Sequence, residues 1–380
     1  MVQPEKTSPA RTSADVESEL VRLREQIDAV DRALLEQLNQ RAQLVRAVGD
    51  LKRTSGAPVY EASRELRIVE ALVRANRGPF PDAGLAPVFR EIISATRSLE
   101  EPVRVAYLGP EGTFSHEAAL QKFGELACLS GVATIPEVFS AVENGKAELG
   151  IVPVENTTEG VVTQTLDALA EFEVTICAEE VLRISHDLLS KSGRIEDVRR
   201  VASHPQPLAQ CRRWLAAHLP DAERVETAST AIAAHLAAGD ASVAAIGSGV
   251  AGRVYGLRSI ETAIEDRRDN STRFLVIGTE QSPPSGSDLT SVVFTIRKDE
   301  AGGLHRLIEP MASRGVNLTS IQLRPIQGKP WEYLFFLDLE GHRSEARVAE
   351  ALAAASAVAN STRILGSFPR ADVAPSAGGR

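Results

Sequence analysis

Several residue types are scarce in this chain of 380 residues. Aromatic side chains make up only 4%, and the three cysteines, Cys128, Cys177 and Cys211, lie far apart and outside any CxxC spacing. They predict reduced thiols in a cytoplasmic protein and no metal site. No run approaches the roughly 18 apolar residues that a membrane span requires. Residues 1–17 lack the apolar centre of a signal peptide, so we expect a disordered tail there.

Concentrated positive charge is also lacking. No segment dense in Lys and Arg offsets the formal net charge of −9, which argues against a nucleic-acid partner. The hydrophobic share of 43% and the charged share of 24% are ordinary for globular proteins. The length is too great for one core and suits two or three domains.

Residues 18–101 have the periodicity of helices throughout. Apolar residues recur at three- and four-residue steps from 20 to 51, a Gly-Ala-Pro sequence at 56–58 ends this helix, and two shorter helices follow at 61–77 and about 86–99. Three helices of these lengths cannot cover the apolar stripe of the first one. We therefore expect this segment to dimerise.

Cations on the long helix suggest an anion site. Arg41 and Lys52 are eleven residues apart, close to three turns, so both project from one face. Arg24 lies about 25 Å further along the helix, so one small ligand meets Arg24 and Arg41 only if a partner helix supplies one of them. The alternative for each cation is a solvated surface charge.

These cations belong to a pattern. Residues 23–28 (LREQID), 60–65 (YEASRE) and 89–94 (FREIIS), with Arg41 and Lys52, resemble the all-helical chorismate mutases. The resemblance implies that Arg41 and the second subunit's Arg24 bind the carboxylates of chorismate, while Lys52 donates to the ether oxygen. The other implied ligands are Glu61, Arg64, Thr96 and Glu100. Glu100 would act in its protonated form, because relatives usually carry a carboxamide there.

Strands alternate with helices from residue 102 to 280 and predict an α/β domain with mostly parallel sheet, long enough for two lobes and a cleft. The expected strands are 103–108, 149–154, 174–178, 200–203, 243–246 and 274–277. Polar segments stand at strand ends, at 109–115, 153–160, 203–211 and 269–274. Each alone could be a helix cap or a turn, but together they favour one crevice.

The four polar segments resemble those of prephenate dehydratases, most specifically Asn270-Ser271-Thr272-Arg273-Phe274. The resemblance implies two lobes like those of periplasmic binding proteins, prephenate between them and no cofactor. It makes Thr272 the contact of the departing hydroxyl. The other implied ligands are Thr113, Ser115, Glu155, Asn156, Ser203, Gln210 and Arg273. Threonine is a poor acid, so Glu155 or His204 must supply the proton, and a purely structural His204 fits the sequence equally well.

Residues 281–288 read as a linker, 289–370 as a βαββαβ, ferredoxin-like unit, and 371–380 as a tail. The unit resembles the ACT regulatory domains that bind phenylalanine, with Gly302-Gly303-Leu304 at the characteristic turn. Gln322-Leu323-Arg324-Pro325 stands where relatives usually carry Glu-Ser-Arg-Pro, so we expect weak regulation by phenylalanine. The alternative is a dimerisation domain that binds no effector.

The order of the three units matches the bifunctional P-proteins of phenylalanine biosynthesis, which convert chorismate to prephenate and then to phenylpyruvate. We therefore expect a homodimer whose chain has an all-α mutase domain, a two-lobed α/β dehydratase domain and an α+β ACT domain. A monofunctional dehydratase with a helical dimerisation domain is one alternative, against which the intact cations argue. A non-enzymatic amino-acid-binding regulator is the other, and Thr272 with Asn156 and Gln210 argues against it.

Overall fold

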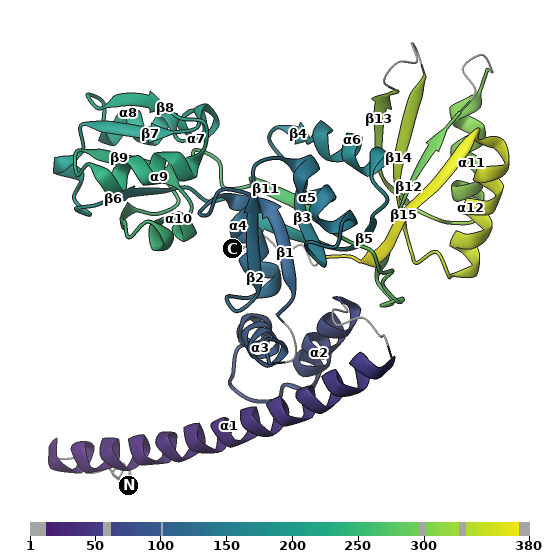
Figure 1. The fold of residues 1–380 in the computed structure, drawn as a ribbon. Helices are drawn as coiled ribbons and strands as arrows, with labels where there is room; N and C mark the ends of the chain where they lie inside the picture. The colour runs from purple at the N-terminus through teal and green to yellow at the C-terminus, as the bar shows by residue number, and fades with distance from the viewer. Residues whose placement is uncertain (1–12, 56–61, 100–101, 297–300, 327–331, 372–380) are drawn as a thin grey trace, which may run out of the picture.

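The computed structural model describes residues 13–55, 62–99, 102–296, 301–326 and 332–371 (Figure 1). The N-terminal part is helical, with α1 (Ser13–Ser55), α2 (Ala62–Ala75) and α3 (Asp82–Arg97). Helix α1 begins at Ser13, five residues before the expected start of the helical part at Ser18. It extends far beyond α2 and α3, and its apolar residues are bare: Leu51 is 70% exposed, and Leu34 56%.

Two α/β lobes follow. Lobe 1 has a sheet in the order β2-β1-β3-β11-β5. Its strands are β1 (Arg104–Leu108), β2 (Cys128–Val132), β3 (Leu149–Asn156), β5 (Thr175–Arg183) and β11 (Ser271–Gly278), and the short β4 (Gly160–Val161) pairs with β3. Its helices are α4 (Phe114–Phe123), α5 (Ile135–Glu143) and α6 (Thr163–Glu171). Apolar side chains of these helices pack with those of the central strands in two buried clusters, one of them lined by α4 and the other by α5 and α6.

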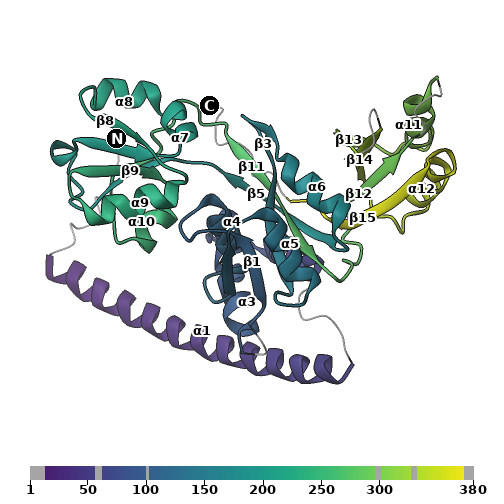
Figure 2. The same cartoon turned by 45° about the horizontal axis from the view of Figure 1, so that its top comes forward.

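Lobe 2 has a sheet in the order β10-β6-β9-β7-β8. Its strands are β6 (Asp187–Ser190), β7 (Arg200–Ser203), β8 (Glu223–Glu226), β9 (Val243–Gly247) and β10 (Arg258–Glu261). Its helices are η1 (Ile195–Asp197), α7 (Pro205–Gln210), α8 (Arg212–His218), α9 (Thr230–Gly239) and α10 (Gly249–Val254). The chain crosses between the lobes twice, after β5 and before β11, as both views show (Figures 1 and 2).

Most strands of each lobe's sheet run in one direction, as expected, but β11 in lobe 1 and β6 in lobe 2 are reversed. Strand β1 runs parallel to β2 and β3, and β7 runs parallel to β8 and β9. Strand β11 is antiparallel to β3 and β5, and β6 is antiparallel to β9 and β10. The antiparallel pairs arise where the chain enters one lobe from the other. The sequence does not reveal this, because strands buried on both faces look alike in either direction.

The C-terminal unit confirms the βαββαβ prediction. Its elements are β12 (Asp288–Thr295), α11 (Gly303–Ser313), β13 (Leu318–Pro325), β14 (Tyr333–Glu340), α12 (Ala346–Val358) and β15 (Ser361–Pro369). The sheet has the order β13-β14-β12-β15, and the two helices pack on one face of it. The other face shares an apolar core with lobe 1, to which Val293, Phe336 and Leu365 contribute. A Cβ at Gly366 of β15 would lie 2.1 Å from the Ile176 carbonyl oxygen of β5, so the two sheets approach as closely as glycine allows.

The helical part contacts lobe 1 at the C-terminal end of α4, and α2 also lies against β15. Arg97 Nη1 of α3 donates to Glu65 Oε1 of α2 at 2.6 Å, and its Nη2 donates to the Phe123 carbonyl oxygen of α4 at 3.1 Å. Gly124, at a φ of +82°, ends α4 beside Ser94 of α3. Lobe 1 is therefore the hub that all other parts contact. None of the helices in the described part of the chain is long and apolar enough to cross a membrane.

Candidate active sites

Three of the expected mutase residues lie together where α1 meets α2 and α3. Arg41 Nη1 donates to Thr96 Oγ1 and, at 3.5 Å, to the Ile92 carbonyl oxygen. Burial lowers the pKa of Arg41, and the positive charge of nearby Arg64 lowers it further. Two guanidinium groups that repel each other in a partly buried place favour a bound anion between them.

Arg24 stands apart from this group, as expected. It is exposed on the free part of α1, and seventeen residues of continuous helix put it about 25 Å from Arg41. Lys52 is half-buried near the other end of α1. Glu61 and Glu100 lie outside the described residues, so their assignments remain those of the sequence.

The sequence analysis missed Glu65, which adjoins Arg64. Burial raises the pKa of the Glu65 carboxyl, against the attraction of Arg97, Lys122, Arg90 and Arg41. Glu65 thus lies between the cations of the mutase group and the ones that face lobe 1. Its position beside Arg64 in the YEASRE segment was the available signal, but an acidic residue next to a basic one is common on helix surfaces.

The dehydratase group centres on a cross-strand pair. Thr272 of β11 lies opposite Asn156 of β3 in the sheet register. Asn156 Nδ2 donates to Thr272 Oγ1 at 2.8 Å and to Asn270 Oδ1 at 2.9 Å, while Asn156 Oδ1 accepts from the backbone amides of Thr158 and Glu159. The Thr272 oxygen is thus an acceptor in this pair, so its own O–H can be donated to a ligand.

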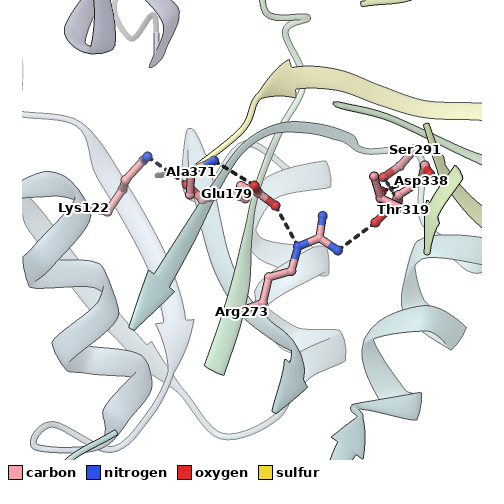
Figure 3. Close-up of polar contacts among 7 residues, drawn as sticks. All are labelled: Lys122, Glu179, Arg273, Ser291, Thr319, Asp338 and Ala371. Carbon is pink, nitrogen blue, oxygen red and sulfur yellow. Dashed lines mark hydrogen bonds and ion pairs between the residues drawn. The ribbon is translucent and has the colours of Figure 1, made fainter. Parts of the chain in front are cut away.

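Two expected ligands do not belong to this group. Arg273 and Glu155 are the next register pair, and successive side chains of a strand point to opposite faces. Arg273 binds Glu179 and Asp338 instead (Figure 3), and Glu155 lines the space between lobe 1 and the ACT sheet. The assignment of Arg273 and Glu155 as substrate ligands is therefore corrected, because the sequence motif does not distinguish the two faces of the strands.

The remaining polar segments meet at the boundary of the lobes. Thr113 caps α4 by accepting from the His116 amide at 3.3 Å, and Ser115, two residues further on, is buried. The Ser203 hydroxyl donates to the Ile246 carbonyl oxygen at 2.8 Å, within lobe 2. His204 Nδ1 accepts from the Gln206 amide, and the charge of His204 opposes the burial that raises the pKa of Glu159 in lobe 1. His204 therefore lies close to the loop that follows Asn156.

His186 is a second residue that the sequence analysis missed. It lies in the crossing segment after β5, is 1% exposed, and stacks edge-on against Phe114 at 5.4 Å. Its Nε2 lies 2.7 Å from Gln210 Oε1. That oxygen only accepts, so Nε2 carries the proton and the Gln210 amide nitrogen keeps its two donors for a ligand. Burial lowers the pKa of His186, which keeps it neutral in this role.

Carboxyl groups crowd the same boundary. Burial raises the pKa of Glu117 in α4 to about 6, although a hydrogen bond with Ser248 lowers it. The negative charge of Asp187 in β6 adds to the rise. Close by, Tyr255 Oη donates to the Glu111 carbonyl oxygen at 3.0 Å. The lobes thus touch through a surface at which one carboxyl group changes charge near neutral pH.

The ACT residues lie at one edge of their sheet. Strands β12 and β13 are both antiparallel to β14, so they end at the same end of the sheet. The turn with Gly302, Gly303 and Leu304 follows β12 there, close to the end of β13. Gly302 has a φ of +76°, which favours glycine. Gln322 faces lobe 1, and Arg324 donates two hydrogen bonds to Asp167 of α6 at 2.8 and 2.5 Å.

Comparisons with known proteins agree with this division. Residues 23–101 match the family model of chorismate mutase type II, residues 105–282 that of prephenate dehydratase, and residues 290–357 that of the ACT domain. The chain is 44% identical to the bifunctional chorismate mutase/prephenate dehydratase of Aquifex aeolicus, over 93% of this chain and 98% of the relative. It is 42% identical to the enzyme of the same name from Pseudomonas aeruginosa, over 93% and 99% of the two chains.

A solved structure shares the larger part of the fold. The prephenate dehydratase of Arthrobacter aurescens in complex with L-Phe is 36% identical, with a TM-score of 0.66, and the match covers 71% of this chain and 91% of that one. The three parts and their order are thus found together in known proteins.

The titration of Glu117 can be measured through stability. Its folded-state pKa of about 6 exceeds the ordinary value of 4.5, so its protonated form stabilises the fold at low pH, and this contribution is lost as the pH rises through 6. We expect Glu117→Gln to be more stable than the wild type at pH 8, and this advantage to be smaller at pH 5. The gain in unfolding free energy should be at most about 2 kcal/mol, and the thermal midpoints of the two proteins at both pH values measure it. The exposed Glu171→Gln is the matched control. Parallel pH profiles of the wild type and Glu117→Gln would contradict this prediction.

Proposed function

This chain belongs to the family of bifunctional chorismate mutase/prephenate dehydratases, and we propose which of its residues carry out the two reactions. It rearranges chorismate to prephenate and then converts prephenate to phenylpyruvate, with loss of water and CO₂. We assign the first reaction to the group around Arg41 and the second to the group around Thr272. The hydrogen bond from Asn156 to Thr272 is the main support for the second assignment, because it leaves the threonine proton free.

The mutase reaction needs no nucleophile, only a fixed substrate conformation and stabilisation of the charge that develops on the breaking ether oxygen. We propose that Arg41 binds one carboxylate of chorismate and that Lys52 donates to the ether oxygen. The repulsion between Arg41 and Arg64 supports this role, because an anion relieves it. Glu61, Thr96 and Glu100 complete the proposed site.

The second carboxylate requires Arg24, which we propose comes from a second copy of the chain. Within one chain the two arginines are about 25 Å apart, further than a small ligand spans. The bare stripe of α1, with Ile27 58% and Leu34 56% exposed, supports a partner helix on the same surface. A homodimer would cover the stripe and complete two mutase sites.

In the dehydratase reaction the ring hydroxyl leaves as water and the ring carboxylate leaves as CO₂. The electron pair of the broken carbon–carbon bond becomes part of the aromatic ring. We propose that Thr272, oriented by Asn156, donates to the departing hydroxyl and that Gln210, Ser203, Thr113 and Ser115 hold the substrate. Of the two earlier candidates for the proton source, we propose His204, since Glu155 lies on the other face of β3.

The ACT domain supports an amino-acid effector, and we propose that phenylalanine is a weak one. Arg324 is bound to Asp167, and Gln322 with Leu323 supplies neither the carboxylate nor the hydroxyl that relatives carry. Cys128, Cys177 and Cys211 are all free, which fits the cytoplasmic location that we also propose.

Removal of the threonine hydroxyl tests the dehydratase assignment. We expect Thr272→Ala to lower phenylpyruvate formation at least about 100-fold, since it removes a donor to the leaving group. Mutase activity should stay near that of the wild type. Ser271→Ala removes the adjacent hydroxyl of the same strand and should change neither activity. Equal loss of both activities in Thr272→Ala would argue against separate sites.

Mixed subunits test the shared mutase site. Arg24→Ala and Arg41→Ala should each be inactive alone, whereas an equal mixture should regain about a quarter of wild-type activity, because half the dimers carry one intact site. Chorismate consumption after subunit exchange, verified by mass-tagged chains, is the measurement. If exchange occurs and no activity returns, each site is built within one chain.

Phenylalanine titration tests the effector proposal. Dehydratase activity should change little at micromolar phenylalanine, and calorimetry should show weak binding. The double variant Gln322→Glu, Leu323→Ser supplies the missing carboxylate and hydroxyl, and it should increase the response. Strong inhibition of the wild type at micromolar phenylalanine would contradict the proposal.

A further inference from the structure

Arg273 connects the dehydratase strand β11 to the ACT sheet. Its Nε donates to Glu179 Oε2 of β5 at 2.7 Å, and its Nη1 donates to Asp338 Oδ2 of β14 at 2.7 Å (Figure 3). The side chains of Glu179 and Asp338 are 4% and 15% exposed. Burial alone would lower the pKa of Arg273, but the two carboxylates raise it. The guanidinium is therefore firmly charged and bound at both ends.

Both carboxylates are themselves held by neighbours. Glu179 Oε1 accepts from the Ala371 amide at 2.8 Å, and Asp338 Oδ1 accepts from the Ser291 hydroxyl of β12 (Figure 3). Removal of the positive charge would leave two buried carboxylates side by side, which is strongly unfavourable. The position of Arg273 is thus fixed by lobe 1 on one side and by two ACT strands on the other.

The position of Arg273 also constrains Thr272. The two are successive residues of one strand, so their side chains point to opposite faces while they share a rigid backbone. A shift of Arg273 toward the ACT sheet therefore moves Thr272 relative to Asn156. A cavity of about 390 Å³ adjoins Arg273, lined also by Glu155, Ser320 and Gln322, so the side chains around this ion pair are not tightly packed on every side.

We propose that Arg273 is a positioning residue for the dehydratase: its bond to Asp338 of the ACT sheet holds this part of β11 in place and so aims the Thr272 hydroxyl. The dehydratase then turns over at full rate only while the ACT sheet is seated. This inference rests on the proposed role of Thr272 in contacting the departing hydroxyl.

The substitution Asp338→Asn tests the positioning role of Arg273. It should disturb the fold little, because Arg273 keeps its ion pair with Glu179, in which the two charges cancel. We expect the dehydratase kcat to fall about tenfold with KM nearly unchanged, since Thr272 acts on the leaving group rather than on ground-state binding. Mutase activity of the same chain, which does not involve β11, should be unchanged and reports on folding.

Asp167→Asn is the matched control. It breaks another ion pair between the same two domains, Arg324–Asp167, which does not involve β11. Its dehydratase kcat should stay within about twofold of the wild type. An equal loss of dehydratase kcat in Asp338→Asn and Asp167→Asn would overturn the inference. It would mean that the rate depends on the contact between the two domains in general and not on Arg273. If Asp338→Asn does not fold, Ser291→Ala, which removes the hydroxyl that orients Asp338, should lower kcat in the same selective way.

Failure of the premise is distinguishable from failure of the inference. If Thr272→Ala keeps dehydratase activity, the proposed role of Thr272 is wrong and the inference falls with it. If Thr272→Ala is inactive while Asp338→Asn has wild-type kcat, only the positioning role of Arg273 is wrong.

Discussion

The pairing of β3 with β11 is the constraint on which the catalytic part of this structure depends. One register pair, Asn156 with Thr272, faces the boundary of the lobes, and the next, Glu155 with Arg273, faces the ACT sheet. The strict alternation of a strand assigns adjacent residues of one motif to two different surfaces. Slippage by one residue would exchange the surfaces, so the apolar core beneath β11, which includes Leu275 and Ile277, protects the chemistry as well as the fold.

The helical part depends on a different balance. Its three helices bury little of α1, and where α1 meets α2 the positive charges of Arg41 and Arg64 repel each other. As a monomer, this part therefore leaves apolar surface of α1 in water and a repulsion between cations unrelieved. The same feature that makes it incomplete, a helix longer than its neighbours, is what allows one chain to reach into the site of another.

Much of this architecture could be predicted from the sequence because it rests on local patterns. Helical periodicity and the breaks near Gly56 and Gly78 predict α1 to α3, and the βαββαβ order predicts the ACT fold. The directions of β6 and β11 could not be predicted, because they depend on crossings between lobes. The roles of His186 and Glu65 could not be predicted for a similar reason, because each depends on a partner that is not adjacent in the sequence. Arg273 was assigned to the wrong surface, because a motif does not show to which face of the strand a side chain points.

The close approach of β15 to β5 bears on how such a chain could have been assembled in evolution. Regulatory domains are often regarded as portable, joined to a catalytic domain by fusion of genes and free to be exchanged. Here the peptide of Ile176 occupies the space where any side chain at position 366 would project, and Leu365 and Phe368 beside it belong to the apolar core shared with lobe 1. A transplanted ACT domain would have to bring a glycine at this one position and apolar residues around it. The sequence of the ACT domain in this protein is thus already complementary to the surface of one particular catalytic domain.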